Sequence, residues 1–383
     1  PEVAAGIPGA AAPRVQAAIA VAPAGGSRDV LPDEHVVVTA VRGTLERVTV
    51  RADGDAAPVP GRMTAGRRGW RTRWTLRPGT AYTVSATGTD GNGARTAATS
   101  RFTTLRPAGT FRIVDVTPRP GELVGVGMPV IVDFDRPIGR RAAVERALEL
   151  RTTRRVTGAW HWVTPQRVVF RPRRYWPAHE HVALTAHTAG VRAAPDVYGA
   201  AGHAASFDVG AARLSTVDTR SHRMSVRIGG RLVRTAGISA GKGGRRAYTT
   251  TSGVHLTMGK GDPVVMTSAW MGVTDHRDPR YYKLKVRHAV QISSSGEYVH
   301  SAPWSVGAQG RENVSHGCVN APPGFARWYY AGSLRGDVVT VTGTDRILEW
   351  TNGWGYWQLP WTRWVTGSAL GHPVRTVPAH RPR

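Results

Sequence analysis

Hydrophobic and polar positions alternate in short runs over the first hundred residues, and Gly-, Pro- and Asp-containing turns separate the runs. This alternation places every second side chain on one face, as in a half-buried strand. The clearest runs are 36–39, 47–50, 70–74, 82–84 and 102–104. Strands at this spacing are typical of an all-β sandwich, so we expect a first immunoglobulin-like domain over residues 29–107.

A second set of β-type runs follows the Pro- and Gly-containing hinge at 106–109. The runs are 130–134, 168–170, 182–185 and 207–209, with a short helix expected near 141–150. Residues 169–172 resemble 75–78, and a strand follows in both cases, which indicates a weak repeat. We expect a second immunoglobulin-like sandwich over 108–210, with Trp160 and Trp162 as packing residues.

A third β-rich region begins near Leu214. Gly229-Gly230 between two alternating runs is a strong two-residue hairpin signal, and further strands are expected at 253–258, 285–292 and 338–341. A helix is expected at 322–331, because Pro lies in its first turn and Gly332 follows its end. The fold class is therefore mainly β, and this third domain spans 211–345.

The ends of the chain differ in composition from these modules. Five tryptophans fall within residues 346–372, which favours a small subdomain packed on a neighbour over a carbohydrate platform. Residues 373–383 are expected to be a solvated tail, and residues 1–28 a flexible tether that follows a removed export signal or lipid anchor. No stretch of the sequence approaches the roughly 20 apolar residues of a membrane span.

The net charge of +25, with a sequence pI near 11.4, indicates a polyanionic neighbourhood. Nucleic acid, an anionic membrane surface and an acidic cell wall are the three options. The basic residues are spread along the chain and form no recognisable nucleic-acid-binding module. We therefore interpret the charge as an adaptation to an anionic cell wall, with no nucleic-acid partner.

The chain has one cysteine, Cys318, and its neighbours suggest chemistry. Gly317 and His316 precede it, and His300 lies eighteen positions upstream, at the end of a β run. A thiol needs a base or a cation beside it to become a nucleophile, and a glycine lets a substrate carbonyl approach the backbone amides. An inert cysteine and a partial metal site of Cys318, His316 and His300 are the alternatives, although zinc requires three or four ligands.

Ser315-His316-Gly317-Cys318-Val319-Asn320 resembles the signature of the L,D-transpeptidase (YkuD-like) family. The upstream segment from His300 to Ser305 matches the same family. The Trp-rich residues 354–361 are similar to the actinobacterial members that carry two immunoglobulin-like domains before the catalytic one. The catalytic resemblance covers about residues 214–344.

This resemblance implies a role for each matching residue. Cys318 would be the nucleophile and His300 its general base, with the carbonyl of Ser301 fixing the imidazole tautomer. His316 would shape the site and stabilise charge. The amides of Gly317 and Cys318, with the Tyr282 hydroxyl from a flap, would face the oxyanion.

The resemblance also implies substrate contacts. Ser295, Gly296 and Asn320 match positions that touch the peptide stem, while Trp304 and Ser305 would line the cleft. Two segments depart from the family pattern: 251–253 reads Thr-Ser-Gly where Pro-Thr-Gly is common, and the flap at 266–282 is unusual.

The implied reaction is acyl transfer between peptidoglycan stems, without a metal or an organic cofactor. The Cys318 thiolate would attack the carbonyl of the third residue of a tetrapeptide stem and release D-Ala, and an acceptor amine would complete a 3→3 cross-link. Water as acceptor would make the enzyme an L,D-carboxypeptidase. Carbapenem-type β-lactams should acylate Cys318. The expected location is the extracytoplasmic cell wall, with membrane attachment only through the removed anchor.

Two alternatives from other classes remain open. A cell-wall cysteine peptidase of another fold is disfavoured, because those enzymes usually place Cys before His in the chain. A non-catalytic wall-binding protein is suggested by the charge and the Trp-rich segment, and the Cys318–His300 pair argues against it.

Overall fold

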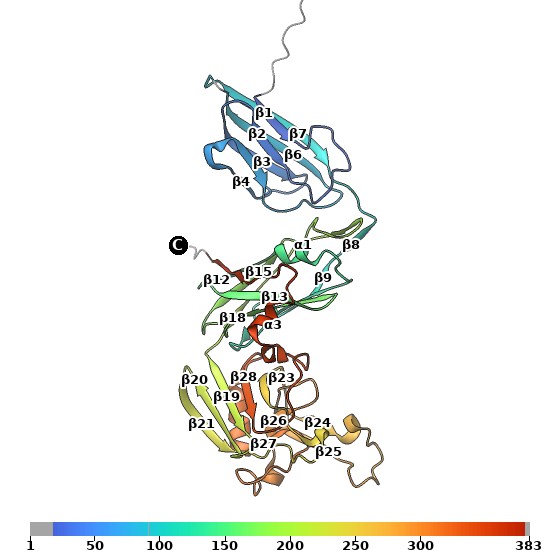
Figure 1. Cartoon of the computed structure of the whole chain (residues 1–383), viewed down its shortest axis with the longest axis vertical. Helices are drawn as coiled ribbons and strands as arrows, with labels where there is room; N and C mark the ends of the chain where they lie inside the picture. The colour runs from blue at the N-terminus through green and yellow to red at the C-terminus, as the bar shows by residue number, and fades with distance from the viewer. Residues whose placement is uncertain (1–17, 91, 380–383) are drawn as a thin grey trace, which may run out of the picture. The chain divides into compact units, whose positions relative to one another are not determined.

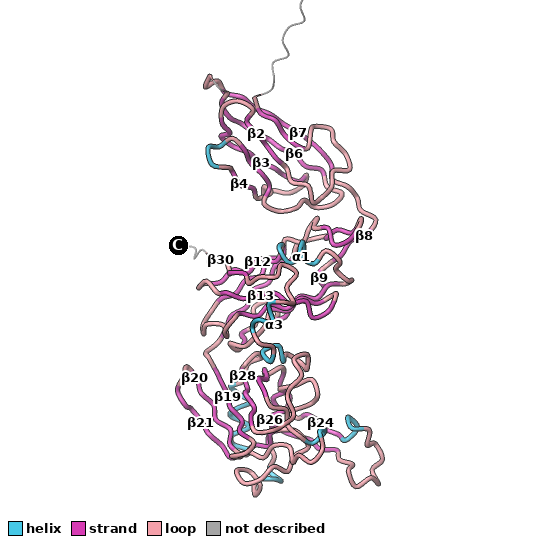
Figure 2. Tube along the Cα trace, viewed as in Figure 1, coloured by secondary structure: helices cyan, strands magenta, loops and turns pink. Residues whose placement is uncertain are grey.

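The computed structural model describes residues 18–90 and 92–379 and divides them into two compact units (Figure 1). The first unit holds residues 18–111 and 187–202, and the second holds 112–186 and 203–379. Strands dominate both units and helices are short (Figure 2), which confirms the expected mainly-β class.

The first unit is a sandwich of two antiparallel sheets with a small third sheet at one end. The sheets have the strand orders β1-β2-β5-β4, β3-β6-β7 and β16-β17-β8. Alternation sets its core: Tyr82, Val84 and Ala86 of β6 are buried and contact residues of the facing sheet. The strands are β1 (Ile19–Ala22), β2 (Val37–Ala40), β3 (Thr44–Ala52), β4 (Gly61–Met63), β5 (Gly69–Thr72), β6 (Ala81–Thr89), β7 (Arg95–Thr103), β8 (Gly109–Phe111), β16 (Arg192–Ala194) and β17 (Val197–Gly199), with the 3-10 helix η1 at Ala65–Arg67.

Part of the expected N-terminal tether is ordered in this sandwich. Residues 1–17 lie outside the described residues, but β1 pairs antiparallel with β2. The reason is apolar burial, because Ile19 is only 4% exposed in the core of the sandwich.

The second unit begins with another two-sheet sandwich. Its sheets have the orders β10-β18-β15-β12-β30 and β29-β13-β14-β11-β9. Trp160 and Trp162 are buried, as expected, and Trp160 packs edge-to-face on Phe170 with ring centroids 5.3 Å apart. The elements are β9 (Ile113–Thr117), β10 (Leu123–Val124), β11 (Val130–Phe134), α1 (Arg141–Arg146), β12 (Leu148–Thr152), β13 (Thr157–Thr164), β14 (Arg167–Pro172), β15 (His181–Ala186) and β18 (His203–Val209). The helix near 141–150 is thus shorter than expected, since its last residues form β12.

The C-terminal β module, residues 213–342, packs two sheets around one core. One sheet has the order β21-β20-β19-β28-β22, and the other has β23-β25-β26-β27 with β24 paired to β25. Its elements are β19 (Arg213–Asp218), β20 (Arg223–Ile228), β21 (Arg231–Gly237), η2 (Arg246–Tyr248), β22 (Gly253–Leu256), β23 (Gly259–Gly261), β24 (Val264–Thr267), η3 (Ser268–Met271), β25 (Lys283–Gln291), β26 (Tyr298–Ser301), η4 (Pro303–Ser305), β27 (Val319–Ala321), α2 (Pro323–Gly332) and β28 (Val338–Thr342). The hairpin at Gly229-Gly230 is confirmed, with φ values of 57° and 83°, and α2 confirms the expected helix.

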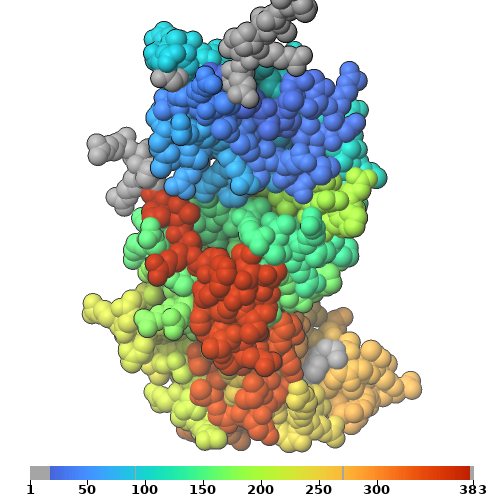
Figure 3. Space-filling view, turned by 45° about the horizontal axis from the view of Figure 1, so that its top comes forward, coloured from blue at the N-terminus to red at the C-terminus, as the bar shows by residue number. Residues whose placement is uncertain are grey.

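The Trp-rich segment packs on the second sandwich instead of forming an exposed platform. Trp364 is fully buried, and its indole Nε1 donates to the carbonyl of Ala159, 2.9 Å away. The Arg171 guanidinium lies over the ring of Trp364, with its Cζ 4.9 Å from the centroid. Figure 3 shows this segment, in red, running over the green sandwich. The remaining elements are η5 (Gly355–Gln358), α3 (Trp361–Val365), β29 (Val374–Arg375) and β30 (Val377–Pro378).

The C-terminal residues differ from the expected solvated tail. β29 pairs with β13, and β30 pairs with β12, so each adds an edge strand to one sheet of the second sandwich. Thr376 between them is 3% exposed, and its hydroxyl lies 2.5 Å from that of Thr152. The edges of these sheets have unpaired backbone N–H and C=O groups, and the C-terminal residues form hydrogen bonds with them. Residues 380–383 lie outside the described residues.

Candidate active site

Two adjacent parallel strands bring His300 and Cys318 to the same part of the C-terminal β module. In the β26–β27 pair Val299 lies opposite Val319 and His300 opposite Asn320. Both valines are fully buried in the core, so the alternating residues His300 and Asn320 face the other side of the sheet. Cys318 immediately precedes β27 and lies beside this face.

His300 is held in one tautomer by the backbone. Its Nδ1 lies 2.9 Å from the carbonyl oxygen of Ser301, and a carbonyl only accepts, so Nδ1 carries the proton and donates it. The side chain of His300 is buried, and this desolvation lowers the pKa of the imidazole below its usual value. A neutral imidazole with a basic Nε2 results, as a general base requires.

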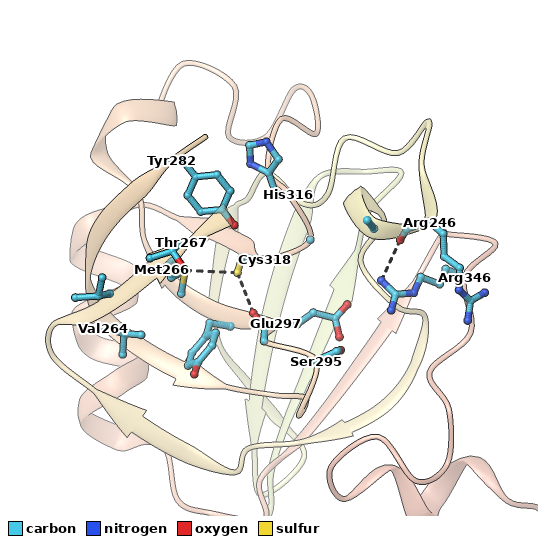
Figure 4. Close-up of a pocket in the computed structure, with 15 residues that line it drawn as sticks. Arg246, Val264, Met266, Thr267, Tyr282, Ser295, Glu297, His316, Cys318 and Arg346 are labelled. Carbon is cyan, nitrogen blue, oxygen red and sulfur yellow. Dashed lines mark hydrogen bonds between the residues drawn. The ribbon is translucent and has the colours of Figure 1, made fainter. Parts of the chain in front are cut away.

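The surroundings of Cys318 favour the protonated thiol. Burial, with a smaller contribution from the charge of Glu297, raises the pKa of the thiol to about 12, and a hydrogen bond with the backbone of Tyr298 offsets only part of this shift. The sulfur lies 3.6 Å from the carbonyl oxygen of Gly296 and 3.9 Å from Sδ of Met266, as Figure 4 shows. Among the described residues, His300 is not a hydrogen-bond partner of the thiol, so the sulfur must leave Gly296 before it can transfer its proton to that base.

A serine hydroxyl shapes the turn before Cys318. Ser315 Oγ accepts from the amide of Gly317 at 3.1 Å and donates to the carbonyl of Cys318 at 2.6 Å. Gly317 has φ of +124°, where a side chain would be strained. In this arrangement the Gly317 amide donates to Ser315, and its role at the oxyanion stays a prediction. Ser315 is part of the sequence motif, but its hydrogen bonds to the turn are seen only in the tertiary structure.

His316 lies between two tyrosines above the thiol. Its ring stacks on Tyr282 with centroids 5.0 Å apart and meets Tyr248 edge-on at the same distance. Burial lowers the pKa of His316, and the charge of Lys242 lowers it further. A neutral ring fixed by aromatic contacts suits the expected shaping role better than that of a mobile base.

A cavity of about 600 Å³ opens over Cys318. Six predicted residues line it, namely Tyr282, Ser295, Gly296, His316, Gly317 and Cys318. Figure 4 shows Tyr282 and His316 on one side of the sulfur and Ser295 on the other. The structure therefore brings the predicted nucleophile together with half of the predicted substrate contacts, namely Tyr282, Ser295 and Gly296.

Five predicted residues do not line this cavity, namely His300, Ser301, Trp304, Ser305 and Asn320. Asn320 is 4% exposed, and its Nδ2 donates to Oγ of buried Ser305 at 3.0 Å. This bond connects the residues after β26 to β27, and the contacts of Asn320 and Ser305 with the stem and the cleft stay predictions. Trp304 is 53% exposed, and its ring centroid is 6.0 Å from that of His300.

Sequence reasoning missed a buried polar network under the cavity. The carboxylate of Glu297 accepts from the amide of Thr251 at 2.7 Å and from its hydroxyl at 2.8 Å. Nε2 of fully buried His255 lies 2.9 Å from the Thr251 carbonyl. Thr251 belongs to the segment 251–253, which departs from the family pattern. This departure was the only feature of the sequence that pointed to the network.

Arginines also line the cavity, and the sequence did not single them out. Arg246 and Arg346 form part of its wall, and Nη1 of Arg346 donates to the carbonyl of Arg246 at 3.0 Å (Figure 4). Within residues 18–90 and 92–379, no group of three or more His, Cys, Asp or Glu side chains is arranged to hold a metal ion. No helix in this part of the chain is long and apolar enough to cross a membrane.

Two family models match the sequence. A bacterial Ig domain model matches residues 27–192, and an L,D-transpeptidase catalytic domain model matches residues 212–341. The second match contains every residue assigned to the cavity except Arg346.

Characterised relatives are similar over most of the chain. L,D-transpeptidase 2 of Mycobacterium tuberculosis is 36% identical over 90% of this chain and 83% of its own length. L,D-transpeptidase 5 of the same species is 32% identical over 92% of this chain and 77% of its own length.

Solved structures resemble part of the chain. An LD transpeptidase in complex with imipenem is 36% identical, with a TM-score of 0.51 over 60% of this chain and 98% of the solved chain. An L,D-transpeptidase from Mycobacterium smegmatis is 35% identical, with a TM-score of 0.50 over 61% of this chain and 99% of its own.

Proposed function

The chain belongs to the L,D-transpeptidase family, and from this premise we propose that it forms 3→3 cross-links between peptidoglycan stems through a thioester on Cys318. The observation that supports the proposal is the buried imidazole of His300 on β26, the strand that pairs with β27 directly after Cys318, with Nδ1 donating to the carbonyl of Ser301. Neutral thiol and neutral imidazole make a pair in which proton transfer and attack are coupled.

In the first half-reaction Nε2 of His300 takes the thiol proton and the sulfur attacks the carbonyl of the third residue of a donor tetrapeptide stem. The carbonyl becomes a tetrahedral oxyanion, which we place against the amide of Cys318 and the hydroxyl of Tyr282. The C–N bond then breaks, His300 gives its proton to the leaving amine, and D-Ala departs. A thioester on Cys318 remains.

In the second half-reaction a side-chain amine of an acceptor stem attacks the thioester. His300 accepts a proton from this amine, the C–S bond breaks, and the sulfur regains a proton. The product is an amide between two stems. Neutral His316 on Tyr282 would hold the Tyr282 hydroxyl over the reacting carbonyl, and Ser295 and Gly296 would contact the donor stem.

The proposed substrate implies that the protein acts in the extracytoplasmic cell wall. The net charge of +25 supports retention at an anionic wall, since opposite charges attract over roughly 8 Å at physiological ionic strength. The imipenem complex of the relative supports the further proposal that carbapenems acylate Cys318.

Intact-protein mass spectrometry with a carbapenem, and separately with a tetrapeptide stem, tests the proposal. We expect one adduct on the wild type, none on Cys318→Ala, and acylation slowed at least about 100-fold in His300→Ala, the loss typical of a removed general base. Loss of D-Ala without a cross-linked product in the presence of an acceptor stem would favour the L,D-carboxypeptidase. A wild type that remains unmodified by both reagents, with a free thiol, would contradict the proposal and favour a wall-binding role.

A further inference from the structure

A second cavity, of about 850 Å³, adjoins the cavity over Cys318. Its walls come mainly from three segments: the turn after β19, residues 241–246 up to the start of η2, and residues 343–346 after β28. Arg246 and Arg346 line both cavities, so the two spaces share a wall. The two cavities are therefore adjacent, with these two side chains between them.

The second cavity is strongly cationic. Five of its fifteen lining residues are basic and one, Asp345, is acidic, whereas Lys and Arg make up 51 of the 383 residues of the chain. The enrichment is therefore more than twofold above an already basic background. The five basic residues are Arg220, Lys242, Arg245, Arg246 and Arg346.

Most of these charges have no carboxylate partner. Arg246 forms an ion pair with Glu349 at 2.5 Å. Within the described part of the chain, the other four have no carboxylate within 4.0 Å of their side-chain nitrogens. Like charges gathered in one cavity repel one another, and an anion in that cavity would relieve the repulsion.

The guanidinium of Arg346 is fixed by two hydrogen bonds to backbone carbonyls. Nη1 donates to the carbonyl of Arg246 at 3.0 Å and to that of Thr249 at 3.2 Å, which fixes the guanidinium. Its Nε is buried and has no hydrogen-bond partner among the described residues. A buried donor without a partner is unfavourable, and a planar guanidinium with free donors matches a carboxylate.

The backbone leaves room for such a ligand. Gly243 and Gly244 both have positive φ, of 71° and 74°, and a Cβ built on either glycine meets no atom within 4 Å. The loop they form therefore lines open space, and its conformation requires glycine.

We propose that this second cavity is an anion subsite that binds a carboxylate of the peptide substrate, with Arg346 and Arg245 as its main cations. The inference rests on the proposed function, because the shared wall connects the subsite to the thiol that the substrate must reach. The donor and the acceptor stem both carry carboxylates, and the two half-reactions distinguish these sources.

Paired stems that differ only in charge test the proposal. One tetrapeptide keeps its free carboxylates, and the other has them converted to amides. We expect the wild type to use the carboxylate stem about 10–100-fold better, the range for a charge-assisted hydrogen bond. Arg346→Gln should remove most of this preference. If the carboxylate stem is preferred in the acylation step, the subsite binds the donor stem. If it is preferred in transfer from the preformed acyl-enzyme, the subsite binds the acceptor stem.

Two variants control for folding and for total charge. Arg245 is exposed and forms no ion pair with the described residues, so Arg245→Gln should reduce the preference without the loss of backbone bonds that Arg346→Gln causes. Arg231→Gln removes an exposed charge from β21, away from the cavity, and should leave the preference unchanged. Iodoacetamide, which is neutral, should still alkylate Cys318 in all three variants if the thiol cavity is intact, and at the wild-type rate in Arg231→Gln.

Binding to a variant without the nucleophile separates this inference from the proposed function. Calorimetry should show the carboxylate stem binding to Cys318→Ala at least about 10-fold more tightly than the amide stem, and the difference should vanish in Cys318→Ala with Arg346→Gln. This result would support the subsite even if the wild type formed no thioester. Equal binding of both stems, or an equal effect of Arg231→Gln, would overturn it.

Discussion

The chemistry of single residues here is governed by burial more than by neighbouring charge. The pKa of Cys318 is raised to about 12 and that of His300 is lowered, in both cases chiefly by desolvation. Each shift favours the neutral form of its group. The resting pair is therefore a thiol and an imidazole, in contrast to the thiolate–imidazolium pair of cysteine enzymes with a depressed thiol pKa.

This state predicts two different pH profiles. The rate of alkylation of Cys318 by iodoacetamide should keep rising up to pH 9 without a plateau, because thiolate is scarce below a pKa of about 12. Carbapenem acylation should be flat at neutral pH and fall only in acid, because burial holds the pKa of His300 below its usual value. Stopped-flow and mass-spectrometric rates measure both.

His300→Ala is the control for these profiles. It should slow acylation but leave the slope of the alkylation profile unchanged, because alkylation needs only the thiolate. An alkylation plateau at neutral pH in the wild type would show a preformed thiolate and contradict the assignment.

At the scale of elements, β26 and the turn before it are held by hydrogen bonds from residues outside the motif around Cys318. Ser295, Gly296 and Glu297 precede β26, and the carbonyl of Gly296 contacts the thiol. Glu297 is 4% exposed and receives its hydrogen bonds from Thr251, which precedes β22 in the other sheet. One residue thus ties the substrate-facing turn to the core.

Replacing Thr251 by valine should destabilise the protein by about 1–3 kcal/mol, because the buried Glu297 carboxylate loses its hydroxyl donor while side-chain volume is kept. Chemical denaturation of the C-terminal module measures the free energy of unfolding. Thr251→Ser keeps the hydroxyl and should recover most of the loss. Equal stability of the valine variant and the wild type would show that water replaces the hydroxyl.

At the scale of the second unit, the C-terminal β module joins the second sandwich through the loop 125–127. The amide of Gly125 donates to the carbonyl of Arg335 at 2.7 Å, and that of Gly127 donates to Gly336 at 2.9 Å. A Cβ on Gly125 would lie 2.2 Å from the amide nitrogen of Asp337, so glycine is required for this approach. Asp337 is fully buried at this junction.

The buried Asp337 predicts a pH-dependent stability. Burial raises its pKa to about 7, and Arg213 and Lys260 only partly offset this effect. A carboxyl whose folded pKa is raised stabilises the folded state below its unfolded pKa, near 4, and this contribution is lost as pH rises through 7. We expect unfolding free energies roughly 2–4 kcal/mol larger at pH 4 than at pH 8 from this group alone.

Asp337→Asn should remove this part of the pH dependence, which thermal unfolding between pH 4 and 8 measures by difference from the wild type. Asp218 provides a control of opposite sign, because the Ser221 hydroxyl lowers its pKa. Its stabilising effect is present above its unfolded pKa and lost as pH falls. A wild-type–variant difference that does not change with pH would contradict the prediction for Asp337.

The sequence by itself determined the mainly-β class, the Gly229-Gly230 hairpin, helix α2 and the motif around Cys318. These features depend on local alternation, turn chemistry and short spacing, all of which a sequence displays. The same local reasoning assigned a tether to residues that include β1 and a solvated tail to residues that include β29 and β30. Short segments carry little pattern, and their state depends on the sheet edges they meet.

Only the tertiary structure decided which polar groups meet. Glu297 and Thr251 are 46 positions apart, and Arg246 and Arg346 are 100 apart. The engagement of the Gly317 amide by Ser315 and the buried Asn320–Ser305 bond likewise follow from chain packing. Hydrogen bonds and charge pairs of this kind require buried donors and acceptors to find partners across the fold, and sequence spacing does not encode that geometry.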